Sequence, residues 1–166
     1  MHDSRGRLVY FVVTGALLAG CASPSPSTTP TQATDTGSWA AVCADPVLSP
    51  LPDWARTGFN PPDQPVAQIW AEKGSIVAVP FGWPLRPQQP AGRQNKVLWI
   101  AKEGRGGPMK IAAQLDGAGG EVVYRELPDG PGPSTVDLPT PGCWRLDLSW
   151  PGGQDRIYLR YFGPAT

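Results

Sequence analysis

Cys21 carries a thiol that an enzyme could modify, and the residues before it indicate how that enzyme would reach it. Two arginines within the first seven residues precede an apolar run over residues 8–18, which suits the ~7–15-residue hydrophobic region of a secretory signal. The small residues Ala19 and Gly20 follow. A membrane peptidase needs small side chains beside its scissile bond, and a lipid transferase needs a thiol to alkylate. The pattern therefore predicts a secretory signal that ends at a modifiable cysteine.

Residues 18–21, Leu-Ala-Gly-Cys, resemble the bacterial lipobox at all four positions. The resemblance implies that the Cys21 thiol takes a diacylglyceryl group, that the chain is cut between Gly20 and Cys21, and that the new amine is open to acylation. One acyl chain binds a membrane marginally and two anchor it stably. One alternative is a transmembrane helix, but the run is too short for a ~30 Å hydrocarbon core. The other is an ordinary secretory signal followed by a chance cysteine.

Cys43 and Cys143 are the remaining cysteines. An even number outside the cytoplasm predicts a disulfide, which would close a loop of about 100 residues and stabilise the fold by ~4.7 kcal/mol in the chain-entropy relation. The bridge would hold the irregular segment around residue 43 against the back of the strand that contains Cys143. The alternative is two buried free thiols, which pack as small apolar groups.

Histidine is informative because the only one, His2, lies in the segment predicted to be removed. The mature chain would then lack the base of Ser-His-Asp and Cys-His nucleophilic sites, and it would lack the commonest zinc ligand. We therefore predict no catalytic residue, no metal site and no cofactor.

Two carboxylate pairs are the remaining candidates for acid–base chemistry: Asp116 with Glu121, and Asp147 with Asp155. Such a pair could act on a sugar as general acid and base. The simpler interpretation is that they are solvated residues at strand ends and turns. A hydrolase built on carboxylates is therefore the least favoured function.

Aromatic residues in loops are the candidates for ligand binding. Trp54 and Trp83 lie in proline-rich loops, and Arg86 and Arg93 follow Trp83 in the sequence. An exposed indole beside such polar groups could stack on a sugar ring or contact a protein partner. The alternative is that both rings cover the ends of the core, as large aromatic side chains usually do.

Charge and composition exclude some partners. The chain has 14 basic and 14 acidic residues, and the predicted cleavage would leave a net charge of −1. A balanced chain without a basic run is not expected to bind nucleic acid. The 20 glycines and 21 prolines are best explained as turns in an all-β domain, because seven tryptophans argue against disorder.

The chain divides into three segments. Residues 1–20 are the predicted signal. Residues 21–37 comprise the lipidated cysteine and a tether rich in Ser, Thr and Pro, with no large apolar side chain to bury. Residues 38–166 form one domain of ordinary size.

Strand patterns dominate that domain. Residues 143–150 alternate strictly, with Trp144, Leu146, Leu148 and Trp150 on one face, which is typical of a half-buried strand. Other strands are predicted over residues 66–71, 75–81, 96–102, 109–115, 121–127, 134–138 and 156–162. Residues 39–43 form a packed loop or a short leading strand, and residues 51–57 at most one helical turn. Seven or eight short strands favour an antiparallel, immunoglobulin-like β-sandwich, with a small β-barrel as the alternative.

The last third of the chain, from Pro133 through Pro-Gly-Cys-Trp at 141–144 to Trp150, resembles a C-terminal pattern in uncharacterised bacterial lipoproteins with predicted sandwich domains. The resemblance implies the fold and the compartment only. We therefore expect a lipid-anchored protein on the extracytoplasmic side of the cell membrane. Its domain would serve non-catalytic binding or structure, and its partner would be an unknown envelope protein or a polysaccharide. A carbohydrate- or peptidoglycan-binding module is the second hypothesis.

Overall fold

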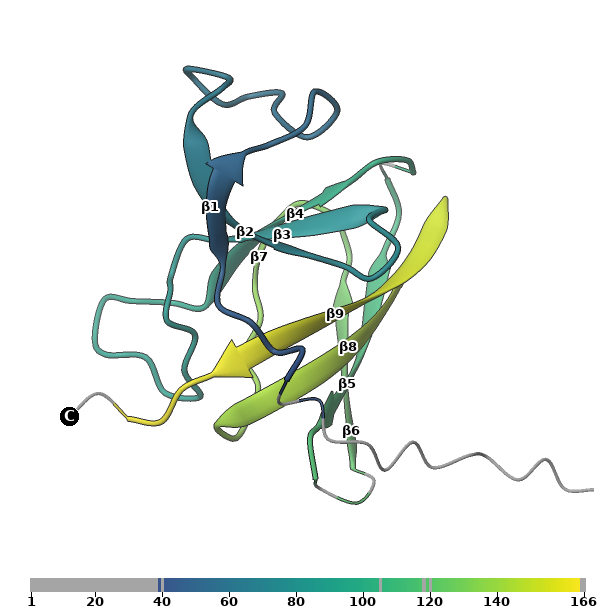
Figure 1. Cartoon of the computed structure of the whole chain (residues 1–166). Coiled ribbons are helices and arrows are strands. Elements are labelled where there is room, and N and C mark those ends of the chain that lie inside the picture. Colours follow the sequence, from purple (N-terminus) through teal and green to yellow (C-terminus); the bar gives the residue numbers. More distant parts are fainter. Residues whose placement is uncertain (1–38, 40, 105, 118, 120, 165–166) are drawn as a thin grey trace, which may run out of the picture. The chain divides into compact units, whose positions relative to one another are not determined.

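A computed structural model describes residues 39, 41–104, 106–117, 119 and 121–164 (Figure 1). The predicted signal, Cys21 and the tether over residues 21–37 lie outside the described residues. Within the described ranges all regular elements are β-strands, and no helix is present. The predicted all-β class is therefore confirmed.

The described residues contain nine strands. In order they are β1 (Val47–Pro50), β2 (Pro65–Trp70), β3 (Ile76–Pro80), β4 (Lys96–Ala101), β5 (Met109–Leu115), β6 (Val122–Leu127), β7 (Pro133–Thr135), β8 (Gly142–Trp150) and β9 (Gly153–Tyr161). Eight of them fall on predicted ranges, displaced by no more than three residues at either end. The ninth, β1, was not predicted. Of the two alternatives for residues 39–43, the described residues form the packed loop and not the short strand. Proline at the end of β1 is tolerated because β1 is an edge strand.

The strands form two antiparallel sheets, in the orders β1-β2-β3-β4-β7 and β6-β5-β8-β9. The chain crosses between the sheets after β4, after β6 and after β7. The sheets do not close into a barrel, so the predicted β-sandwich is confirmed over the barrel alternative. The described part of the domain contains nine strands, where seven or eight were expected.

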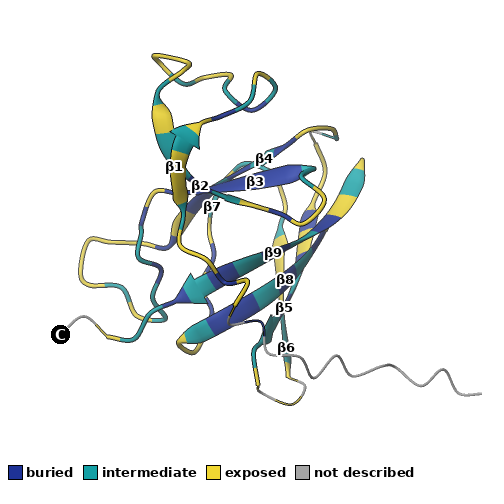
Figure 2. Cartoon of the chain, viewed as in Figure 1, coloured by how far each residue is buried: buried dark blue, intermediate teal, exposed yellow. Residues whose placement is uncertain are grey.

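The core lies between the two sheets (Figure 2). The predicted alternation along β8 is confirmed, because its tryptophans and leucines are all buried in this core. Trp99 of β4 packs there from the opposite sheet and donates its indole N–H to Ser134 Oγ at 3.0 Å. Inward-facing side chains from both sheets thus bury a continuous apolar layer, which is the main source of stability in such folds.

A second, smaller core covers the outer face of the five-stranded sheet. All five residues of β3 are buried, because alternate side chains face the main core and the outer layer. Val77 and Val79 pack outward against Leu51 and Ala55. Leu51 and Ala55 follow β1 in a stretch that makes one helical turn, in which Ala55 N and Arg56 N both donate to the Pro52 carbonyl. The expectation of at most one turn there is confirmed.

Candidate binding face

The outer face of the four-stranded sheet presents side chains in cross-strand rows, set by the antiparallel registers. One row runs Tyr124, Ala112, Asp147 and Arg156 across β6, β5, β8 and β9. The neighbouring row runs Glu126, Lys110, Ser149 and Gln154. Because side chains alternate along a strand, residues between these rows, such as Ile111, point into the core instead.

Part of this outer face, around Cys143 and Tyr158, is covered by Trp39 and Cys43, which we call the N-terminal cover. Cys43 forms a disulfide with Cys143 of β8, with 5.7 Å between the Cα atoms. The guanidinium of Arg145 lies 4.5 Å from the centre of the Trp39 ring, and Arg160 Nη2 donates to the Cys43 carbonyl at 2.7 Å. The predicted disulfide is confirmed, and it holds the irregular N-terminal segment against the back of β8.

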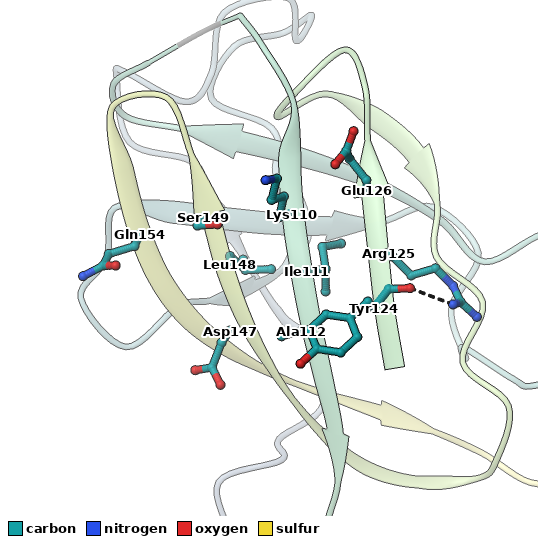
Figure 3. Close-up of a pocket in the computed structure, with 10 residues that line it drawn as sticks. All are labelled: Lys110, Ile111, Ala112, Tyr124, Arg125, Glu126, Asp147, Leu148, Ser149 and Gln154. Atoms are coloured by element: carbon teal, nitrogen blue, oxygen red, sulfur yellow. Dashed lines mark hydrogen bonds between the residues drawn. The ribbon is translucent and has the colours of Figure 1, made fainter. Parts of the chain in front are cut away.

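The part of the outer face that carries the two rows is open and slightly hollow (Figure 3). The depression has a volume of about 660 Å³, within the usual range for small-ligand sites. Tyr124 is 73% exposed, and its cross-strand neighbour Ala112 is small, so that the ring has no bulky side chain beside it on β5. The term open face is used below for the eight outward residues of the two rows: Lys110, Ala112, Tyr124, Glu126, Asp147, Ser149, Gln154 and Arg156.

Charges on the open face are compensated by neighbours. Asp147 Oδ1 accepts from Arg156 Nε at 2.6 Å, and Asp147 Oδ2 lies 3.5 Å from Arg145 Nε. The hydrogen bond to Asp147 raises the pKa of the Arg156 guanidinium above its usual value. The Asp147 side chain is therefore flanked by two guanidinium groups.

Asp155 does not converge with Asp147. Its cross-strand partner is Leu148, which faces the core, whereas the partner of Asp147 is the outward Arg156. The Asp155 carboxylate accepts hydrogen bonds from the β2–β3 turn, from Lys73 N at 2.9 Å and from Ser75 N and Oγ at 3.0 and 2.6 Å. Burial alone would raise its pKa, but these hydrogen bonds outweigh burial and hold the pKa below its ordinary value. The two residues thus belong to opposite faces of the sheet, although both line a smaller depression at the β8–β9 end of the domain.

The other carboxylate pair flanks the turn between β5 and β6. Asp116 N donates to the Cys143 carbonyl at 2.9 Å, and Glu121 is exposed beyond the turn. Neither residue lines the depression. The pair therefore belongs to a turn and not to the open face.

Three of the four residues expected to bind ligand lie together in the loop over residues 82–94. Trp83 packs edge-on against Phe162 at 5.4 Å, Arg93 Nη2 donates to the Trp83 carbonyl at 3.1 Å, and Arg86 donates to the Gly163 carbonyl. Trp54 lies elsewhere, in the outer core of the five-stranded sheet, edge-on to Trp70 at 5.9 Å. Both indoles are half-buried, and each contacts another aromatic ring of the domain.

The sequence patterns did not predict Tyr124 or Ala112 as binding residues. The residues before Tyr124 are valines, so the strand lacks the strict alternation that marks β8. The register that sets Tyr124 opposite Ala112 depends on the path of the intervening turn, which composition does not fix.

Among the residues with described positions, no group of three or more His, Cys, Asp or Glu side chains is placed to hold a metal ion. The same residues contain no helix long and apolar enough to cross a membrane. Comparisons with protein families, curated proteins and solved structures find no match.

Proposed function

We propose that this chain is a cell-envelope lipoprotein, held by acyl chains on Cys21 at the extracytoplasmic side of the membrane, that displays a non-catalytic binding domain. The lipobox resemblance and the tether over residues 21–37 support the anchoring. The disulfide between Cys43 and Cys143 fits an oxidising compartment.

The open face is the binding surface in this proposal. The observation that carries it is Tyr124, a largely exposed aromatic ring beside a depression on a rigid sheet. On the outer face of the other sheet, an apolar layer packs on β3, and the N-terminal cover packs on another part of this one. Binding residues on strands are held in fixed positions by the hydrogen-bonded ladder, which lowers the entropy lost on binding.

The anchoring is tested with Cys21→Ser in the full chain. We expect mass spectrometry of the native protein to show a chain that begins at an acylated Cys21. The variant should leave the membrane fraction. An uncleaved, unmodified native amino terminus, or a variant that stays equally membrane-bound, would overturn the anchoring.

The binding surface is tested by filling the depression. Ala112→Arg places a long side chain beside Tyr124 and should abolish co-purification of envelope material with the membrane-extracted protein. Phe81→Ala is the matched control, because Phe81 is an exposed aromatic outside the open face. Equal recovery of the same material with Ala112→Arg and with the native chain would contradict the assignment of this face.

A further inference from the structure

We propose that the open face binds an uncharged saccharide, with one sugar ring stacked on Tyr124 over the depression beside Ala112. This inference rests on the proposed function and names the ligand class of the same face. It moves the site from the Trp83 loop, where the sequence suggested it, to the four-stranded sheet.

Tyr124 supplies the stacking surface. Figure 3 shows its ring extending from β6 across β5 beside Ala112, with the hydroxyl directed toward the side of Asp147. The face of the tyrosine ring is apolar and suits the C–H face of a sugar ring. The hydroxyl at the edge of the ring remains able to hydrogen-bond. A larger residue than alanine at position 112 would occupy the space that the sugar ring needs.

Polar groups surround the ring on the side of β8 and β9. Asp147 and the Ser149 hydroxyl lie on β8, and the Gln154 amide lies on β9 opposite Ser149. Lys110 stands next to Ser149 on β5. These side chains offer both donors and acceptors, which is what neighbouring sugar hydroxyls require, because each hydroxyl donates once and accepts twice.

The charges of the face argue for an uncharged ligand. Asp147 is already paired with Arg156 and Arg145, and Lys110 is the direct cross-strand neighbour of Glu126. A polyanion or a polycation would gain from one sign and be repelled by the other. Hydroxyl groups can instead donate to the carboxylates and accept from the cations without disturbing these pairs.

The same charges make a protein partner a poorer fit. Cores of protein–protein interfaces are depleted of charged residues and place their aromatic side chains in desolvated surroundings. Here Asp147 is directly opposite Ala112, and Lys110 and Glu126 are two residues along their strands from Ala112 and Tyr124. Burying Tyr124 under a protein would desolvate those groups as well, at a cost that a hydrated saccharide avoids.

The experiment uses the full chain, extracted from membranes in detergent, on an array of uncharged oligosaccharides. The array includes tetrasaccharides of β-1,4-linked N-acetylglucosamine and of β-1,4-linked glucose, with heparin as the charged comparator. We expect binding to at least one uncharged oligosaccharide and none that depends on charge. Tyr124→Ala should weaken that binding by about tenfold, Ala112→Leu should abolish it, and Tyr124→Phe should retain most of it. Phe81→Ala is the control and should bind as the native chain does.

The results separate this inference from the proposed function. Native protein that binds no uncharged oligosaccharide, or binding that survives both Tyr124→Ala and Ala112→Leu, overturns the inference. If envelope material still co-purifies and is lost with Ala112→Arg, the proposed binding face stands and its ligand is of another class. If that material is unaffected by Ala112→Arg as well, both proposals fail. Unfolding curves for each variant exclude loss of the fold as the cause.

Discussion

The outer faces of the two sheets differ in how far they are covered by other parts of the chain. On the five-stranded sheet, the outward valines of β3 are sealed by Leu51 and Ala55, which adds a second apolar layer. On the four-stranded sheet, the N-terminal cover protects one part through a disulfide, and another part stays open and polar. An outer face that is closed by apolar packing serves stability, whereas a polar face left open around a large ring is available for binding.

The covers also differ in what holds them. Residues 51–55 are held by apolar burial, since Leu51 is only 3% exposed. The N-terminal cover has a smaller apolar cluster, made of Trp39, Cys43 and Cys143 with Tyr158 beside it. It depends instead on a covalent bond and on two arginines, Arg145 and Arg160. The comparison predicts that chemical reduction destabilises the N-terminal cover on the four-stranded sheet. Truncation of Leu51 should instead destabilise the apolar layer on the five-stranded sheet.

Removing the disulfide should have the largest effect. Cys43 and Cys143 are 100 residues apart, a loop for which the chain-entropy relation gives about 4.7 kcal/mol. We expect Cys43→Ala/Cys143→Ala to lower the free energy of unfolding by about 3–5 kcal/mol in urea denaturation. Reductant should bring the native chain to the same value and leave the double variant unchanged. A loss below about 1 kcal/mol would mean that the arginine contacts suffice to hold the cover.

Truncating the apolar cover comes next. Leu51→Ala should cost about 2–4 kcal/mol in the free energy of unfolding, because it removes buried methyl groups and leaves a cavity over Val77 and Val79. Leu48→Ala is the matched control, since Leu48 is close in sequence and 71% exposed, and it should change stability by less than about 0.5 kcal/mol. Equal effects for the two leucines would show that the outer layer adds no stability. Reductant should not alter the difference between them.

Asp155→Asn tests the contact between the two sheets, with a smaller effect. Its carboxylate accepts from the β2–β3 turn, so the variant should lose about 1–3 kcal/mol at pH 7. Because hydrogen bonds hold the folded-state pKa below the unfolded value, the stabilisation is complete above the unfolded pKa and is lost as the pH falls through the folded pKa. Unfolding curves of both proteins should therefore converge as the pH drops below about 4. A difference that persists unchanged at pH 2 would contradict this role of the charge.

Much of this architecture follows from local sequence patterns. The strict alternation over residues 143–150 places Trp144 and Cys143 on opposite faces of the strand, and so predicts which face of β8 points inward. Together with the even number of remaining cysteines, it predicts the disulfide on the outer face of β8. The open face could not be predicted from such local patterns. It depends on which residues of β6 oppose β5, and a shift of one position would turn Tyr124 to the other side.

The loop that contains Trp83 shows a second limit of prediction from sequence. An indole beside two arginines in a proline-rich stretch fits a ligand site by residue type alone. In the fold, Trp83 contacts Phe162 and its carbonyl accepts from Arg93, so both residues already make contacts within the domain. Residue types identify groups capable of binding, but only the tertiary contacts show whether the protein already uses them.

The smallest stability change is expected on the open face itself. Tyr124→Ala should alter the free energy of unfolding by less than about 0.5 kcal/mol, because the side chain is largely exposed and lies outside both cores. Phe81→Ala, at 58% exposure, should behave alike in the same urea experiment. The two rings should then differ only in oligosaccharide binding, where Tyr124 matters and Phe81 does not. A destabilisation above about 1.5 kcal/mol for Tyr124→Ala would show that the ring serves the fold, and the contrast between a sealed face and an open one would be lost.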